Sequence, residues 1–105
     1  MKKPNLAAEA ELVNEFRKLI SDVPGKNFAK PLSEFWEGCQ PHECAVYGCT
    51  GVWFSAEGGT TMKDNTIPAD AYSDFLHPEF KEFLKNHKNV YLDWYDGGTP
   101  MLIMK

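Results

Sequence analysis

The chain opens with a helical pattern of apolar and charged positions. Between Asn5 and Ser21 apolar side chains recur every three or four residues, and most of the charged side chains take the other face. The apolar positions are Leu6, Leu12, Val13, Phe16, Leu19 and Ile20, and the charged ones are Glu9, Glu11, Glu15, Arg17 and Lys18. The pattern predicts an amphipathic helix over 5–21 that ends near the turn signal Pro24-Gly25.

A mixed stretch and then a strand-like stretch follow this helix. From Lys26 to Gly38 the apolar positions have no regular period, and Pro31 excludes a central strand because it lacks a backbone donor. We therefore expect a loop with a short strand or turn. Ala45 to Ser55 is rich in residues that favour strands, and Gly48 and Gly51 indicate a bulge or a close backbone contact.

Residues 57–87 carry turn and helix signals. Glu57-Gly58-Gly59 predicts a hairpin turn into a strand over Thr60 to Lys63. Ala69 to Leu76 is expected to form a short helix. Pro78 suits the first position of a further helix, because a helix start has no use for the N–H that proline lacks. Phe80, Phe83, Leu84 and His87 would share one face of it.

The C-terminal residues predict a β-hairpin. Val90 to Tyr95 alternates apolar and polar side chains, and Asp96-Gly97-Gly98 turns this strand into a second one over Met101 to Met104. The order of helix, strands, helix, strands predicts an α+β fold, an antiparallel sheet with helices packed on one side. The 105 residues are the usual length of a single domain, 1–105.

Composition and charge narrow the classes of function. The hydrophobic fraction of 43% and the charged fraction of 25% are typical of a globular protein. A net charge of -4, with eleven basic residues scattered among fifteen acidic ones, argues against nucleic-acid binding and favours a basic protein partner. No stretch approaches the roughly 20 apolar residues of a membrane span, and no signal peptide is visible.

Three cysteines, Cys39, Cys44 and Cys49, lie close together. Their spacing allows a short disulfide with one thiol left over, a local metal site, or three unrelated buried thiols. A bond between Cys39 and Cys44 would enclose four residues and add roughly 2 kcal/mol of stability. The centre of that ring would be His42 and Glu43, a titratable donor beside an acceptor.

The segment Cys39-Gln40-Pro41-His42-Glu43-Cys44 resembles the C-K-P-H-[DN]-C loop of the Ivy family, bacterial inhibitors of vertebrate-type lysozyme. Gln40 stands where the family's loop has Lys, and Glu43 is one carbon longer than the family's acid or amide. The resemblance implies an inhibitory loop that projects from an antiparallel sheet and places His42 against the catalytic carboxylates of the enzyme. It also implies a periplasmic or secreted protein. The sequence itself leaves the oligomeric state open, a homodimer included.

The chemistry of a lysozyme cleft agrees with this hypothesis. Such a cleft holds one carboxyl group kept protonated by an apolar pocket and one that is ionised. An imidazole has two nitrogens that pair with both groups, so His42 would exclude substrate. The expected partner is therefore a vertebrate-type (c-type) lysozyme or a related glycoside hydrolase.

The alternative is a small interaction module with a structural zinc cluster. Cys39, His42, Cys44 and Cys49 are suitable zinc ligands, but C-x2-H-x-C-x4-C is not one of the familiar paired spacings, and Pro41 stiffens it. No nucleophile with a partnered base and no cofactor loop is recognisable, so we expect neither an enzyme nor a bound cofactor or catalytic metal.

The remaining histidines and large rings are expected to have structural roles. His77 and His87 flank the predicted helix and should be capping or surface residues. Trp53, Trp94 and Phe83 are expected in the core, because rings of this size dominate the packing of a small domain.

Overall fold

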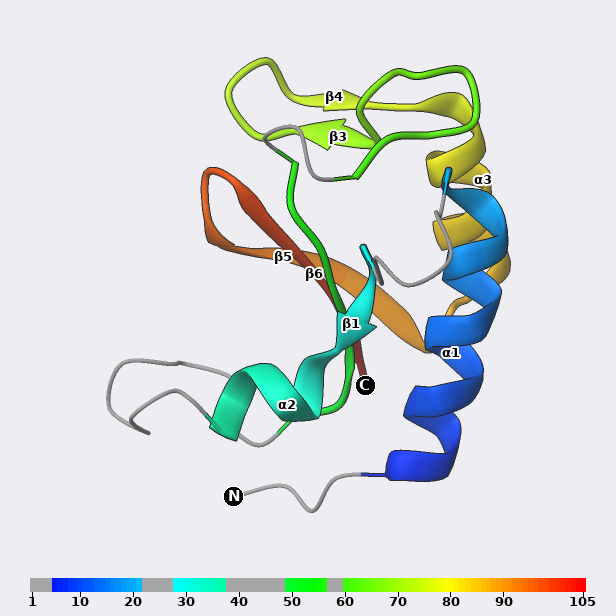
Figure 1. Cartoon of the computed structure of the whole chain (residues 1–105), viewed down its shortest axis with the longest axis vertical. Helices are drawn as coiled ribbons and strands as arrows, with labels where there is room; N and C mark the ends of the chain where they lie inside the picture. Colours follow the sequence, from blue (N-terminus) through cyan, green and yellow to red (C-terminus); the bar gives the residue numbers. More distant parts are fainter. Residues whose placement is uncertain (1–4, 22–27, 38–48, 57–59) are drawn as a thin grey trace.

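The computed structural model describes residues 5–21, 28–37, 49–56 and 60–105, and it has the α+β fold that the sequence predicts (Figure 1). Its helices are α1 (Leu6–Leu19), α2 (Leu32–Glu37) and α3 (Pro78–Asn86). Its strands are β1 (Lys30–Pro31), β2 (Gly51–Trp53), β3 (Ala69–Asp70), β4 (Phe75–Leu76), β5 (Val90–Asp96) and β6 (Thr99–Met104). No helix in these ranges is both long and apolar enough to cross a bilayer.

The main sheet is antiparallel, with strand order β1-β2-β6-β5. Strands β5 and β6 form the predicted hairpin, and Asp96 Oδ1 accepts a hydrogen bond from Gly98 N at 3.0 Å inside its turn. Pro31 lies in the edge strand β1, where its missing N–H leaves no gap in the ladder. The exclusion of Pro31 from a central strand is therefore confirmed.

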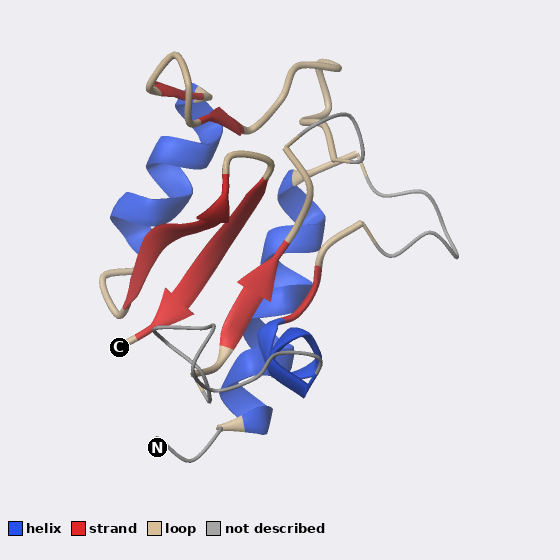
Figure 2. Ribbon diagram, turned by 90° about the vertical axis from the view of Figure 1, so that its left-hand side faces the viewer, coloured by secondary structure: helices blue, strands red, loops and turns tan. Residues whose placement is uncertain are grey.

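Helices α1 and α3 lie together against one face of the sheet (Figure 2). Phe16 of α1 is fully buried there, with its ring 4.8 Å from that of Phe54 and in edge contact with Phe80 and Phe83. Val52, Val90 and Leu102 supply the strand side of this core. Burial of each large ring stabilises the fold by about 1.5–3 kcal/mol, so these helices and the sheet depend on one another.

Helix α2 packs against the opposite face of the sheet and was not expected as a helix. Leu32 is fully buried against Met101 and Ile103, which alternate along β6 with the residues that face the larger core. Phe35 packs beside them. The sheet is thus covered on both faces, by two helices on one and by a single short helix on the other, whereas the sequence predicted helices on one side only.

Helices α1 and α3 begin as the sequence indicates. The Asn5 side chain caps α1 by accepting from Ala8 N at 3.2 Å, and Pro78 is the first residue of α3. Helix α1 ends at Leu19, and the next residue, Ile20, forms an isolated antiparallel bridge with Met62. The predicted helices over 5–21 and after Pro78 are therefore confirmed.

Two local predictions are wrong. Residues 60–63 do not form a strand, since only Met62 makes a bridge. Residues 69–76 form the β3–β4 hairpin instead of a helix, because Asp70 accepts from Tyr72 N at 3.0 Å and from Ser73 Oγ at 2.8 Å, which closes a turn. Asp74 completes that turn with a φ of 57°. The predicted turn at 57–59 and residues 45–48 of the predicted strand lie outside the described residues.

Candidate functional site

The predicted inhibitory loop lies within residues 38–48, outside the described part of the chain. Its residues are Cys39, Gln40, Pro41, His42, Glu43 and Cys44. The structure does describe the two stems of this segment, which are α2 before it and Cys49 with β2 after it. The stems are neighbours, because β1, which leads directly into α2, pairs with β2.

A buried carboxylate on α1 joins the two stems. Glu9 is only 2% exposed, and its Oε2 accepts from Ser33 N of α2 and from Gly51 N of β2, each at 3.0 Å. Glu9 Oε1 accepts a further hydrogen bond from Ser33 Oγ. A single side chain therefore fixes the beginning of α2 and the beginning of β2 against α1, and we call this arrangement the Glu9 clamp.

Gly51 is the position at which the clamp needs glycine. Its φ is +154°, and a Cβ atom there would lie 1.8 Å from the Leu102 carbonyl oxygen on the neighbouring strand. Only a residue without a side chain allows β2 to approach β6 this closely while it donates its N–H to Glu9. The close backbone contact predicted at Gly51 is confirmed.

Glu9 and Ser33 were missed as anchors by the sequence prediction. The pattern of α1 suggested that Glu9 belongs to its solvated face, but Glu9 lies three and four residues before the buried Leu12 and Val13. That spacing places it on the apolar stripe. An acid within an apolar stripe is the one signal that could have identified it, because a buried carboxylate requires hydrogen-bond donors.

An aromatic cluster adjoins the stems on the α2 face of the sheet. The Phe35 ring lies 5.1 Å from that of Trp53 and 4.8 Å from that of Tyr95, and Lys30 Nζ stands 5.3 Å above the Trp53 ring. Cys49, a half-buried free thiol, packs against the buried residues Leu32, Met101 and Ile103. Trp53, which the sequence predicts in the core, is only half-buried and packs against Leu32, Met101 and Ile103.

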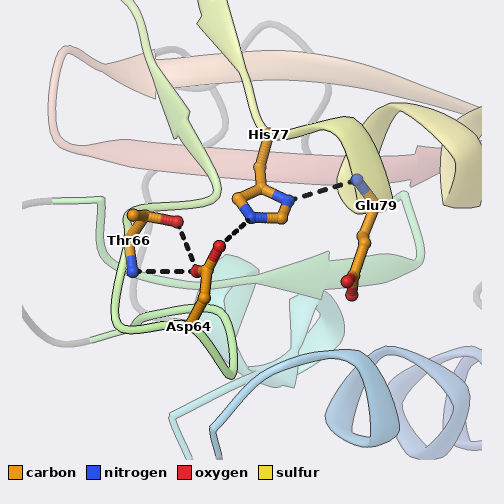
Figure 3. A network of polar contacts seen from close by, with 4 residues as sticks. All are labelled: Asp64, Thr66, His77 and Glu79. Carbon is orange, nitrogen blue, oxygen red and sulfur yellow. Dashed lines mark hydrogen bonds and ion pairs between the residues drawn. The ribbon is translucent and has the colours of Figure 1, made fainter.

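A second polar network lies at the start of α3 (Figure 3). His77 is 7% exposed; its Nδ1 accepts from Glu79 N at 3.1 Å, and its Nε2 lies 2.9 Å from Asp64 Oδ2. Because Nδ1 accepts, the proton is on Nε2 and is donated to Asp64. Asp64 also accepts from the backbone and the hydroxyl of Thr66. Hydrogen bonds from His77 first, and then from Thr66, hold the pKa of Asp64 well below its usual range.

Neither described histidine has a ring nitrogen free for catalysis. His77 is the N-cap of α3, with both nitrogens bonded, and His87 is its C-cap. The His87 ring stacks on Phe83, and its nitrogens contact Phe83 O at 2.8 Å and Glu15 Oε2 at 2.5 Å. The expectation that both histidines are capping or surface residues is confirmed, since each caps one end of α3.

Metal ligation is not apparent in the part of the chain that the structure describes. No group of three or more His, Cys, Asp or Glu side chains suited to a metal ion occurs there. Of the four candidate zinc ligands only Cys49 is described, and Cys39, His42 and Cys44 are not. The zinc hypothesis therefore stays a prediction.

No protein-family model, no curated protein and no solved structure matches this chain.

Proposed function

We propose that this protein inhibits a vertebrate-type lysozyme, or a related glycoside hydrolase, by inserting His42 of the segment 39–44 between the two catalytic carboxyl groups. The Glu9 clamp is the observation that carries the proposal. Glu9 holds Ser33 and Gly51, one on each stem, against the same helix, so the intervening segment starts and ends at a fixed base.

A fixed base suits an inhibitory segment for an energetic reason. Ordering a loop on binding reduces affinity, whereas a loop whose stems are already ordered loses less entropy when it binds. In the proposal Cys39 and Cys44 form a disulfide that restricts the tip in the same way, which requires an oxidising compartment such as the periplasm. The clamp then restricts the base of the segment, and the disulfide restricts its tip.

The charge of the chain supports a basic target. The net charge of -4 would raise the association rate with a basic enzyme and would do so less at high salt. Within the segment, Pro41 would limit backbone freedom, Glu43 would meet donors at the cleft edge and His42 would face the carboxyl groups. Gln40 would contribute contacts at the rim.

The test is hydrolysis of peptidoglycan by a vertebrate-type lysozyme, measured with the purified chain and with three variants. His42→Ala should weaken binding by about 2 to 4 kcal/mol, tenfold to nearly thousandfold, because the target's carboxyl groups lose their donor. Glu43→Ala should cost about 1 kcal/mol at the solvated rim. His87→Ala, at the C-cap of α3, is the matched control, because the His87 ring bonds to Phe83 and Glu15 and to neither stem, and it should inhibit like the parent while it is folded.

Thermal melts and metal analysis of the same samples separate the outcomes. His42→Ala that inhibits as well as the parent at an unchanged Tm would refute the insertion of His42. Loss of one equivalent of zinc from the His42→Ala variant, together with a lowered Tm, would instead support the structural Cys/His cluster.

A further inference from the structure

An apolar groove is lined by residues of the β3–β4 hairpin and of β5, at the other end of the sheet from the Glu9 clamp. Figure 1 shows the β3–β4 hairpin beside the turn of the β5–β6 hairpin. Its apolar walls are Leu76, Leu92, Trp94 and Phe75, and its volume is about 320 Å³. Trp94 pairs with Pro100 near the start of β6, whereas Gly51 of the clamp pairs with Ile103 near its end. The groove is at the lower limit of ligand pockets, about 300 Å³, and is large enough for one side chain.

The rim of the groove is acidic. Asp70 and Asp74 line it, and no lysine or arginine among the described residues does. Hydrogen bonds from Ser73 Oγ, and then from Tyr72 N, lower the pKa of Asp70, so its carboxylate is charged at neutral pH. An apolar groove with a negative rim is complementary to a side chain that has an apolar stem and a cationic head.

The hairpin that forms one wall is held in place. The Tyr72 hydroxyl lies against the β5–β6 turn so closely that a Cβ atom on Gly97 would come within 2.0 Å of it. Tyr72 is nevertheless 81% exposed and Phe75 is 39% exposed. Exposed aromatic side chains on a rigid support are typical of the residues that dominate binding energy at protein interfaces.

The edge of β5 is poorly suited to an added strand at Trp94, beside the groove. Trp94 N, at this edge, donates to Asp93 Oδ1 at 2.8 Å, and the ladder shifts register between Trp94 and Asp96. A side chain that occupies an edge N–H and an irregular ladder both oppose strand addition. Recognition at this edge therefore falls to the groove and its side chains.

We propose that the groove binds an arginine side chain of a basic protein partner. The aliphatic stem lies on Leu76 and Leu92, and the guanidinium stacks on Trp94 while it faces Asp70 and Asp74. Arginine fits better than lysine because its planar, weakly hydrated head both stacks on a ring and pairs with carboxylates. The groove contains no residue of the segment 39–44, so arginine binding there is independent of the proposed inhibition.

The probe is N-acetyl-arginine-N-methylamide, titrated into the ¹⁵N-labelled full chain at low salt and followed by NMR. The amide signals of Leu92 and Trp94 and the Trp94 indole signal should shift saturably, and the shifts should weaken as salt rises. The citrulline counterpart has the same shape without the charge and should cause shifts several-fold smaller. The proposal would be overturned if citrulline caused equal shifts or if no shift saturated. It would also be overturned if the signals moved with the concentration of the protein and not with that of the added probe.

Two isosteric variants at neighbouring acids sharpen the test. Asp74→Asn removes a rim charge and keeps a residue that tolerates the positive φ of this turn, so it should weaken binding about three- to fivefold. Asp93→Asn is the matched control, because Asp93 does not line the groove and its replacement keeps an acceptor for Trp94 N. It should change affinity less than twofold. Equal weakening by both variants would mean that the net charge of the chain, and not the groove, attracts the probe.

Discussion

The Glu9 clamp and the His77 network are both buried polar anchors, but they connect the chain over different distances. Glu9 bonds to residues 24 and 42 positions away and joins α1, α2 and β2. His77 bonds to residues 2 and 13 positions away and joins the start of α3 to the turn at Asp64. The first anchor holds together parts of the fold that meet only in the tertiary structure, and the second closes a local corner.

The two anchors also differ in how their polar atoms are satisfied. The Glu9 carboxylate is buried and accepts its hydrogen bonds from two backbone N–H groups and a hydroxyl. Arg17, on the same helix, is not among its donors and bonds to Ala29 O at 3.0 and 2.8 Å. His77 faces Asp64, whose side chain is 57% exposed. Water can replace a lost partner at Asp64 and not at Glu9, so the anchors should respond differently to substitution.

The largest effect is expected from Glu9→Ala. The change leaves the N–H groups of Ser33 and Gly51 buried without an acceptor, at a cost of about 1–3 kcal/mol each, so we expect a loss of about 3 kcal/mol or more in the free energy of unfolding. Denaturant unfolding measures it. Glu11→Ala, on an exposed position of the same helix, should change it by less than about 0.5 kcal/mol.

Glu9→Gln separates hydrogen bonding from charge. The amide oxygen can still accept from the two backbone N–H groups, and the hydroxyl of Ser33 can turn to accept from the amide nitrogen. This variant should therefore be closer in stability to the parent than to Glu9→Ala. At a temperature where both variants are folded, Glu9→Ala should inhibit lysozyme less well than Glu9→Gln. If Glu9→Ala and Glu11→Ala had the same free energy of unfolding, the hydrogen bonds of Glu9 would not stabilise the fold.

A smaller effect is expected from His77→Ala. The variant loses the N-cap of α3 and the contact with Asp64, and loss of an N-cap costs about 1–2 kcal/mol. His77→Asn keeps an acceptor for Glu79 N and should recover part of this loss in the same denaturant experiment. Neither variant should alter lysozyme inhibition, because the side-chain hydrogen bonds of His77 go to Asp64 and Glu79 and not to either stem. A larger loss of stability than for Glu9→Ala would reverse the ranking of the two anchors.

The sequence predicted the elements whose patterns are long and regular. Helix α1 and the β5–β6 hairpin follow apolar periods of 3.6 and 2, and Pro78 marks the start of α3. Helix α2 has only six residues, too few to display a helical period, and it forms because Leu32 is buried against β6. Tertiary burial of this kind is not visible in local sequence.

The predictions for 69–76 and for Glu9 failed for one reason. The sequence does not show which hydrogen-bond donors an acidic side chain meets in the fold. Asp70 could have stayed in a helix but instead bonds to Tyr72 N and Ser73 Oγ and turns the chain. Glu9 could have faced water but meets N–H groups from distant elements. The segment 39–44 was predicted from its residue types alone, whereas the stems that carry it required the structure.

The smallest expected effect is a pH dependence of stability at Asp64, the exposed partner in the His77 network. The pKa of Asp64 is lowered in the folded chain, chiefly by the hydrogen bond from His77. A group with a lowered pKa stabilises the fold above its unfolded pKa and loses this contribution as pH falls towards its folded pKa. The Tm difference between the parent and Asp64→Asn should therefore be constant near neutral pH and shrink below about pH 4. Because Asp64 is exposed, the difference should be only a few degrees and should fall with added salt. A Tm difference that stays constant from pH 7 down to pH 2 would show that the hydrogen bonds which lower the pKa of Asp64 do not stabilise the fold.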